Sequence, residues 1–444
     1  MPAGSFDVDV AIVGGGYCGG MLTAHLSAVP DLRVATFERD AWALGVAYAT
    51  HNPRHLLNLR AGRMSAFPDS ENDFVAWAGD VAPDAFVPRR RYGEYLQSVF
   101  ERWTAGVDRV HRLHAQVTGI TEEGAGFRLT AAHETVRAAC VVLALGTFAP
   151  SDDFVGDAAR SSPQYVSNPW KVPFDDLSGD VMLIGSGLTA IDVVVELEHR
   201  QYAGDVYMLS RHGLLPQVHR NYGEPIESDV DTGSALSMLR SVRASIARAQ
   251  RDDLDWQAVV DGIRPLTQGI WQSWPLRERE RFLRHVRAYW ETSRRRVPPE
   301  VEQAVRDMRE RGTLHPMAAR IQSIERRGDA FRVTARHAGE MLVRDVDWLI
   351  NCTGPRGDVV KIDDPLIRSL LDGGLLRPHA TRIGVDAMPD GRTIDADGNV
   401  RDRLLVAGSF LRGVLYESVS VPELRVQVRA LADRITESLA RTPG

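Results

Sequence analysis

Residues 7–20 read DVDVAIVGGGYCGG, and this stretch decides how the N-terminal part of the chain folds. The apolar run Val8–Val13 is rich in β-branched residues and too short for a helix, so it predicts a buried parallel strand. Gly14, Gly16 and Gly19 follow with G-x-G-x-x-G spacing and lead into a helical pattern. Such a turn presents backbone N–H groups at a helix start and keeps side chains away, which suits a dinucleotide pyrophosphate.

The strand expected after this helix ends in an acidic residue. Residues 32–37 form a second short apolar run, and Glu38 closes it. A carboxylate about 20 residues beyond the glycines is placed to bind ribose hydroxyls. An N-terminal unit with a glutamate at this point resembles FAD-binding units more than NAD-binding ones, so FAD is the expected nucleotide.

A second glycine motif lies far along the chain. Residues 180–197 read DVMLIGSGLTAIDVVVEL, with Gly185 and Gly187 followed by Ala190. The motif again follows a short apolar strand and opens a helical pattern, so it predicts a second dinucleotide site. Two such sites in one chain indicate a flavoprotein that takes hydride from a nicotinamide.

The strand after the second motif ends without an acid. The sequence VYMLSRHG places Ser210 and Arg211 where a carboxylate would otherwise stand. An arginine there suits a 2′-phosphate, which a carboxylate would repel. NADPH is therefore the expected nucleotide of this site, and NADH stays open as the alternative.

These motifs predict an α/β chain with two Rossmann-like dinucleotide-binding domains and a helical insertion in the second. We expect a discontinuous FAD-binding domain, 1–175 and 330–444, and an NAD(P)H-binding domain, 176–329. The helical, charge-rich insertion covers about 234–312. Two further strand ends, VVLALGTFAP and WLINCTGP, place Gly146 and Gly354 beside the nucleotides.

Composition sets the broad class of the protein. The 444 residues carry a formal net charge of −6, which gives no reason to expect nucleic acid as a partner. No apolar run approaches the roughly 18 residues needed to span a membrane, and no signal peptide is visible, so we expect a cytoplasmic protein without membrane partners. The 3 cysteines are far apart in sequence, which argues against a disulfide framework. No metal site is expected.

Longer motifs carry a resemblance to a known family: IVGGGYCG, GVAYAT, HLLNLRAGRMSAFPD, FVPRRRYGEYL, LIGSGLTAIDVV, LSRHGLLP and GVLYESVSVPELRVQ. The chain resembles the bacterial FAD-NAD(P)-binding family of two-dinucleotide flavoproteins, which includes a FAD-dependent urate hydroxylase and is related to flavin N-hydroxylases. The resemblance covers nearly the whole chain and implies the fold and both cofactors.

The chain also departs from some relatives. The cysteine pair of disulfide reductases is absent, and residues 161–171, SSPQYVSNPWK, lack the histidine of the Baeyer–Villiger fingerprint. Near the C-terminus, LLVAGSF puts Gly408 and Ser409 where many relatives have Gly-Asp, so the flavin ribityl contact must be made differently.

The resemblance implies that the flavin carries the reaction and that the protein supplies position and electrostatics. Reduced flavin would meet O₂, form a C4a-hydroperoxyflavin and transfer an OH group. Asn58 resembles the asparagine close to the flavin in N-hydroxylases. The other expected catalytic residues are Arg60, Arg63 and Glu417. Pro422 and Glu423 begin a helix whose N-terminal dipole would stabilise the flavin anion.

Three functions stay open at this level. The first is a flavin monooxygenase that hydroxylates a small polar substrate, with a purine such as urate as one candidate. The second is an NAD(P)H oxidase or flavin reductase that passes electrons to O₂, a quinone or another acceptor. The third is a flavin-binding regulatory protein. The expected partners are a small-molecule substrate and O₂, and the chain is expected to be a monomer or homodimer.

Overall fold

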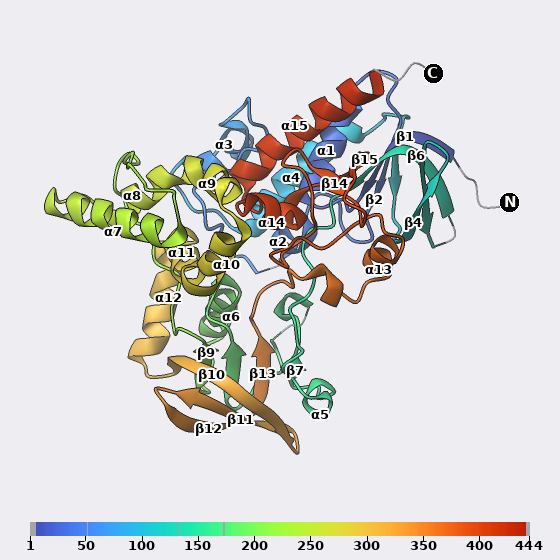
Figure 1. Cartoon of the computed structure of the whole chain (residues 1–444). Coiled ribbons are helices and arrows are strands. Elements are labelled where there is room, and N and C mark those ends of the chain that lie inside the picture. Colours follow the sequence, from blue (N-terminus) through green and yellow to red (C-terminus); the bar gives the residue numbers. More distant parts are fainter. Residues whose placement is uncertain (1–5, 51, 133, 172–173, 441–444) are drawn as a thin grey trace.

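Two β-sheets organise the chain, as the computed structural model shows for residues 6–50, 52–132, 134–171 and 174–440. Helices pack on both sheets and give an α/β architecture (Figure 1). Each sheet contains parallel strands that flank a glycine motif. The predicted class of two Rossmann-like units is therefore confirmed.

The first sheet has the strand order β14-β15-β6-β1-β2-β3, and the hairpin β4–β5 pairs with β6. Its central strand β1 is parallel to both neighbours, with Val10 opposite Val34 on one side and Cys140 on the other. The strands are β1 Phe6–Val13, β2 Val34–Phe37, β3 Val110–Leu113, β4 Val117–Glu123, β5 Gly126–Ala131, β6 Glu134–Leu143, β14 Arg392–Ile394 and β15 Val400–Val406.

Long helices cover one face of this sheet. Helix α1 (Tyr17–Ser27) packs between α4 (Arg89–Thr104) and α15 (Val421–Ala440), and the three bury a common apolar core with β1. The other face carries the β4–β5 hairpin and α13 (Pro365–Asp372). The shorter elements of this unit are α2 Gly45–Tyr48, α3 Asp73–Ala78, α14 Arg412–Leu415 and the 3-10 turns Ala61–Arg63, Val359–Lys361 and Gly408–Leu411.

The second sheet has the order β12-β11-β10-β9-β8-β13-β7. Helices α6 (Leu188–His199) and α12 (Pro299–Glu310) pack together over its parallel part. The strands are β7 Tyr165–Val166, β8 Val181–Ile184, β9 Val206–Ser210, β10 Leu314–Arg327, β11 Ala330–His337, β12 Glu340–Val346 and β13 Trp348–Asn351. Residues 330–351 pair with this sheet, so the boundary expected at 330 falls inside it, and we propose instead that the units divide where the chain crosses between the sheets.

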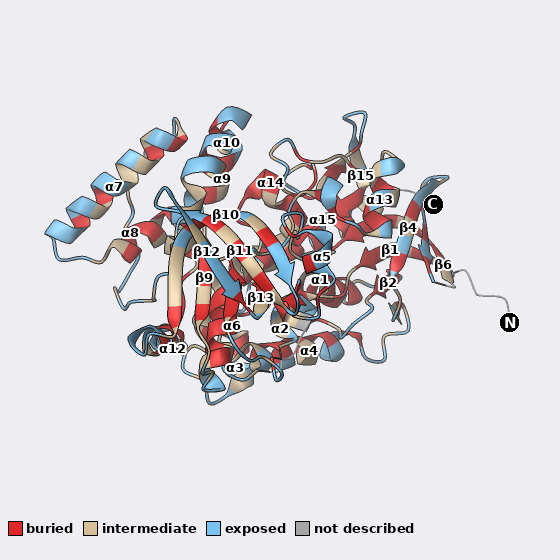
Figure 2. Ribbon diagram, turned by 90° about the horizontal axis from the view of Figure 1, so that it is seen from below, coloured by how far each residue is buried: buried red, intermediate tan, exposed pale blue. Residues whose placement is uncertain are grey.

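Between β9 and β10 the chain forms a helical insertion that stands away from the sheet (Figure 1). Its helices are α7 Ala235–Arg251, α8 Trp256–Ile263, α9 Thr267–Ser273, α10 Leu276–His285 and α11 Arg287–Arg294. They share an aromatic core that includes Trp271, Trp290 and, from the C-terminal loop, Tyr416. Figure 2 shows buried residues both on the strands and on helices such as α6, and shows that α7 turns an exposed face outward.

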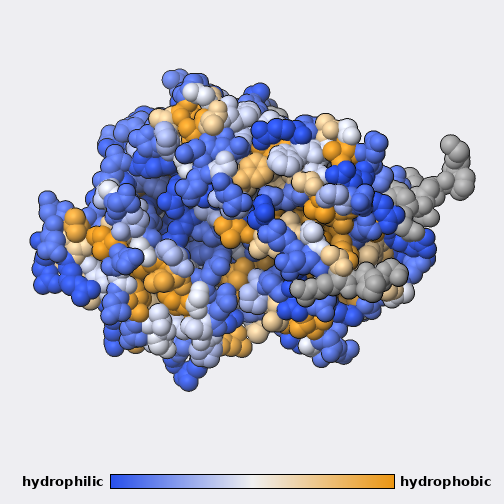
Figure 3. Space-filling model, turned by 90° about the horizontal axis from the view of Figure 1, so that it is seen from above, coloured by the Kyte–Doolittle hydropathy of each residue, from blue (hydrophilic) through white to orange (hydrophobic). Residues whose placement is uncertain are grey.

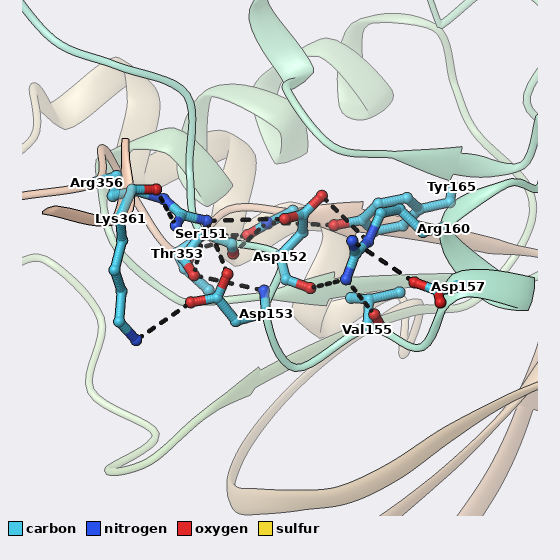
Figure 4. Close-up of polar contacts among 11 residues, drawn as sticks. Ser151, Asp152, Asp153, Val155, Asp157, Arg160, Tyr165, Thr353, Arg356 and Lys361 are labelled. Carbon is cyan, nitrogen blue, oxygen red and sulfur yellow. Dashed lines mark hydrogen bonds and ion pairs between the residues drawn. The ribbon is translucent and has the colours of Figure 1, made fainter. Parts of the chain in front are cut away.

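The chain crosses between the sheets twice, after β6 and after β13, and the two crossings lie side by side. Phe148 and Arg356 form a bridge between them. Arg356 also contacts Asp153 at 3.0 Å, and Asn351 donates to the carbonyl of Ser151 at 2.9 Å. Figure 4 shows this polar cluster, in which Arg356 and Asp153 lie close to Lys361. A short α5 (Asp157–Arg160) follows the first crossing.

The outer surface is mostly polar. Figure 3 shows one face on which hydrophilic side chains predominate and apolar ones form scattered patches. None of the helices in the described ranges is both long and apolar enough to cross a membrane.

Candidate nucleotide-binding and active site

Two positions of the first glycine loop have room only for glycine. Gly14 has φ +99°, and a Cβ there would lie 2.4 Å from the carbonyl oxygen of Ala144. A Cβ on Gly19 would lie 1.8 Å from the carbonyl oxygen of Gly14. Gly16 is the N-cap of α1 and provides no side-chain cap, which leaves the first backbone N–H groups of the helix for an anion. The loop therefore fits a pyrophosphate.

Glu38 lies directly against this loop. Its Oε2 accepts the backbone N–H of Gly15 at 2.8 Å. Its Oε1 accepts the N–H groups of Arg39 at 2.9 Å and Asp40 at 3.0 Å. These bonds hold the carboxylate at the end of β2 beside the start of α1, which is the position that a ribose-binding carboxylate needs.

The second loop repeats the tight first glycine but has different polar groups beside it. Gly185 has φ +116°, and a Cβ there would lie 2.4 Å from the carbonyl oxygen of Cys352. A Cβ on Gly187 would meet nothing within 4 Å. Ser186 and Ser210 hydroxyls lie 2.8 Å apart, and Ser210 Oγ accepts the N–H of Gly213 at 2.9 Å. A hydroxyl pair thus occupies the place that Glu38 has in the first loop.

Arg211 follows at the end of β9. Its side chain is exposed and makes no hydrogen bond or ion pair with the described residues. An arginine that is free and exposed beside the second glycine loop can reach a phosphate without breaking an existing contact. Its placement is consistent with the 2′-phosphate prediction.

Further glycines gather at the same edge of the first sheet. Gly146 follows β6 and Gly408 follows β15, with φ +64° and φ +77°. The hydroxyl of Ser409 donates to the carbonyl of Gly146, and Gly408 lies against the Sγ of Cys18 in α1. Gly354 has φ +83° and lies on the second crossing. Parallel strand ends and a helix start therefore meet at one edge, where α/β proteins bind ligands.

The loop that carries Asn58 faces the second unit. The backbone carbonyl of Asn58 accepts a hydrogen bond from His219 Nε2 at 2.9 Å. Burial lowers the pKa of His219 to about 4, so the ring is neutral and serves as a donor here. The side-chain amide of Asn58 makes no hydrogen bond with the described residues, which leaves it free to donate to a ligand.

The two arginines of this loop differ. Arg60 donates to the carbonyl of Asp84 at 3.1 Å and to Asn221 Oδ1 at 2.5 Å, so existing contacts hold its guanidinium. Arg63 ends a 3-10 turn and is exposed. Of the two, Arg63 is the one whose charge is available to an anionic ligand.

The carboxylates of the C-terminal loop both contact the helical insertion. Glu417 is buried and accepts a hydrogen bond from Trp290 Nε1 at 3.2 Å. Glu423 lies in the first turn of α15 and accepts two hydrogen bonds from Arg264, at 2.8 and 3.0 Å. Pro422 precedes it in the same turn. The insertion is therefore fastened to the loop that begins α15.

One contact that the sequence motifs do not reveal joins the two nucleotide units. Arg89 makes two hydrogen bonds to Asp192, at 2.8 and 3.0 Å, and both side chains are largely buried. Arg89 is in the first turn of α4, and Asp192 is in α6, directly after the second glycine loop. His55 Nε2 lies 3.3 Å from the carbonyl of Asp192. The run Arg89-Arg90-Arg91 was the available signal, but the partner of its first member could not be found without the fold.

The cysteines are separate from one another. Cys18, Cys140 and Cys352 are all free thiols. Burial raises the pKa of Cys18 and of Cys140 to about 12, and raises that of Cys352 as well. Within the described residues there is no group of His, Cys, Asp or Glu side chains that could hold a metal ion.

Known proteins resemble this chain in part of its sequence and in its fold. A family model described as FAD-NAD(P)-binding matches residues 11–148, which confirms the resemblance over that segment. The ornithine N-hydroxylase of Kutzneria sp. 744 is 18% identical with a TM-score of 0.66, and the match covers 98% of this chain and 100% of that one. The L-lysine 6-monooxygenase of Pseudomonas syringae is 18% identical with a TM-score of 0.62, covering 97% and 100%.

A reductase has the same architecture. The bacillithiol disulfide reductase of Staphylococcus aureus is 14% identical with a TM-score of 0.61, and the match covers 98% of this chain and 99% of that one. No curated protein matches the sequence. The fold is thus one that an N-hydroxylase, a monooxygenase and a disulfide reductase share.

Proposed function

We propose that this chain is an FAD-dependent, NADPH-oxidising monooxygenase that hydroxylates a small polar substrate. The observation that carries the proposal is the pair of unlike glycine loops, one closed by the carboxylate of Glu38 and the other by Ser210 and the exposed Arg211. A carboxylate suits ribose hydroxyls, whereas an arginine suits a 2′-phosphate. Two different nucleotides, FAD and NADPH, fit this difference.

FAD would be held at the first sheet. The N–H groups around Gly16 would bind its pyrophosphate and Glu38 its ribose, while Ser409 and the start of α15 at Pro422 would face the flavin end. When bound, FAD would supply two-electron transfer and the reaction with O₂. NADPH would lie at Gly185 and Gly187, with its 2′-phosphate near Arg211.

The Asn58 loop and Glu417 would act on the substrate side. The free amide of Asn58 can donate a hydrogen bond to a polar group without adding charge. Arg63 can attract an anionic reactant, and Arg60, held by Asp84 and Asn221, would fix the position of the loop. Glu417, bonded to Trp290, would orient the insertion over the site.

The reductase alternative is less well supported. A dithiol mechanism needs two neighbouring cysteines with accessible thiolates. The thiols here are separate, and burial raises the pKa of each. An oxidase or a reductase with a non-thiol acceptor remains the second candidate. The second glycine loop is intact, which disfavours a flavin-binding protein with only a regulatory role.

The test is product formation under ¹⁸O₂ with NADPH. Urate is the purine candidate, and ornithine, lysine and cadaverine are suggested by the names of structural neighbours. A monooxygenase incorporates one labelled oxygen atom into product and couples it to NADPH consumption. Hydrogen peroxide in amounts equal to the NADPH consumed, with every compound tested, would overturn the proposal in favour of an oxidase.

Asn58→Ala sharpens this test. If the amide contacts the reacting group, the variant should oxidise NADPH but release more hydrogen peroxide per product than the wild-type enzyme. Arg54→Ala is the matched control, because Arg54 is exposed in the same loop. The cytoplasmic location and the monomeric or homodimeric state remain predictions from the sequence.

A further inference from the structure

Three arginines gather where the helical insertion meets the C-terminal loop. Arg287 begins α11, Arg295 follows its end, and Arg412 begins α14. Glu291 lies among them, with Oε2 2.5 Å from Arg295 Nε and Oε1 paired with Arg412. The hydroxyl of Tyr416 donates to the same carboxylate at 3.0 Å. Glu291 therefore has its bonds from Arg295, Arg412 and Tyr416, and none from Arg287.

Arg287 interacts with Glu291 through its charge but is not hydrogen-bonded to it. Its side chain is half-buried, and it makes no hydrogen bond or ion pair with any residue that the structure describes. The Nε of Arg412 is also buried without a hydrogen-bond partner. A cation held against other cations and partly removed from water is destabilised unless a counter-charge arrives. Arg287 and Arg412 thus both have N–H donors without partners among the described residues. A bound anion would accept hydrogen bonds from them and stabilise the protein.

The charges in this cluster also favour a bound anion. Burial alone would raise the pKa of Glu291, but Arg295, Arg412 and Arg287 lower it to about 2. Burial and the charge of Arg412 lower the pKa of Arg287. Glu417 is the other carboxylate that acts on Arg412. Three cations thus face two carboxylates, and the cluster keeps an excess of positive charge.

The cluster lies between segments that the proposed function uses. Tyr289 in α11 packs its ring 5.9 Å from that of His212, which directly follows Arg211. The backbone N–H of Gln217 donates to the carbonyl of Thr292 at 3.1 Å, so the loop after β9 lies along α11. On the other side, Gly413 accepts a hydrogen bond from Trp271 at 2.8 Å.

We propose that Arg287, together with Arg412, forms a binding site for an oxyanion group, either a carboxylate or a phosphate. The planar guanidinium presents two parallel N–H donors to such a group. The group would belong to the substrate, as a carboxylate, or to NADPH, as a phosphate, and this assignment rests on the proposed function. Anion binding itself does not.

The first experiment measures anion binding by thermal unfolding of the FAD-loaded full chain in increasing inorganic sulfate and malonate. For the wild-type protein we expect a saturable rise in Tm. Arg287→Gln should need at least about tenfold more anion for the same rise, because a charge-assisted bidentate contact is lost. Arg287→Lys should recover part of the response. Arg284→Gln, which removes an exposed arginine from α10, is the matched control and should titrate like the wild type.

Stability without anion separates binding from a structural role. Since Arg287 has no hydrogen-bond or ion-pair partner among the described residues, Arg287→Gln should keep or raise the Tm in anion-free buffer. A marked fall in that Tm would mean that Arg287 is a structural residue and would overturn the site. Equal titrations of the wild type and Arg287→Gln, or no response of the wild type, would also overturn it.

Kinetics then distinguishes the source of the anion. If Arg287→Gln raises the KM for NADPH about tenfold, the group is a nucleotide phosphate. If the KM for NADPH is unchanged while malonate protection is lost, the group is a substrate carboxylate. Should no NADPH oxidation be found at all, the proposed function fails, but the anion titration still decides whether the site exists.

Discussion

The two glycine loops have nearly the same sequence pattern but differ in the polar groups that close them. In the first, Gly14 and Gly19 each lie against backbone, and the carboxylate of Glu38 bonds to the loop itself. In the second, Gly185 likewise lies against backbone, Ala190 stands in place of the third glycine, and serine hydroxyls replace the carboxylate. Under the proposed function, the carboxylate of the first loop matches FAD, and Ser210 with Arg211 at the second matches NADPH.

The largest expected effect comes from a substitution that disrupts the first glycine loop and leaves the second intact. Gly19→Ala would force a Cβ to within 1.8 Å of the Gly14 carbonyl, so the helix and strand would have to separate. We expect loss of FAD and of most soluble folded protein. Gly187→Ala meets no atom within 4 Å and should keep full FAD content. Flavin absorbance per protein measures both, and equal FAD loss in the two variants would contradict the comparison.

The next largest effect concerns the ion pair between Arg89 and Asp192, which joins the two units. Arg89→Gln leaves the largely buried Asp192 without its partner, and breaking such a pair costs about 3–5 kcal/mol. Denaturant unfolding should show this loss, with slower flavin reduction by NADPH. Arg90→Gln removes the neighbouring arginine, whose exposed pair with Glu94 is worth about 0.5 kcal/mol. Similar losses in both variants would mean that Arg89 does not join the units.

Glu38→Ala tests the acid that distinguishes the first loop. The variant loses a charged acceptor, and contacts of this kind contribute about 1.5–3 kcal/mol, so FAD affinity should fall between tenfold and a hundredfold. Ser210→Ala should leave FAD affinity unchanged. FAD titration of the apoprotein gives both values. Asp40→Ala, an exposed neighbour, serves as the charge control.

A pH dependence should come from His219, which holds the Asn58 loop to the second unit. Burial lowers its folded-state pKa to about 4, below the value of about 6.5 in the unfolded chain. The folded state thus favours the neutral ring, and its stabilisation is present above pH 6.5 and is lost as the pH falls toward 4. We expect a slope of about 1.4 kcal/mol per pH unit in that window. Unfolding of His219→Gln at several pH values should show a shallower slope; an unchanged slope would assign it to other groups.

The smallest expected effect tests the role of Arg211 beside the second glycine loop. Arg211→Ala would remove the proposed contact of this exposed side chain with a 2′-phosphate, worth about 1 kcal/mol, so the KM for NADPH should rise about fivefold and the KM for NADH should not change. Steady-state oxidation of both nucleotides measures this. Equal changes for NADPH and NADH would remove the 2′-phosphate role of Arg211.

Local sequence patterns predicted the residues whose role depends only on neighbours within the same strand, turn or helix start. The glycines, the short apolar strands β1 and β8 and the acid after β2 could be predicted because strand, turn and helix start are contiguous. Strands β10 and β12 were not anticipated in full. Their exposed faces carry many charged residues and they depend on pairing with β11, so the sequence alone gave a weak strand pattern.

By itself, therefore, the sequence determined the two nucleotide loops, the fold class and the difference between Glu38 and Ser210-Arg211. Only the tertiary structure decided which distant side chains meet: Arg89 with Asp192, Arg264 with Glu423, and Arg287 with no hydrogen-bonded partner among the described residues. The reason is physical. A glycine loop is specified by backbone space within a few residues, whereas an ion pair depends on how two sheets and an insertion pack, and no local pattern encodes that.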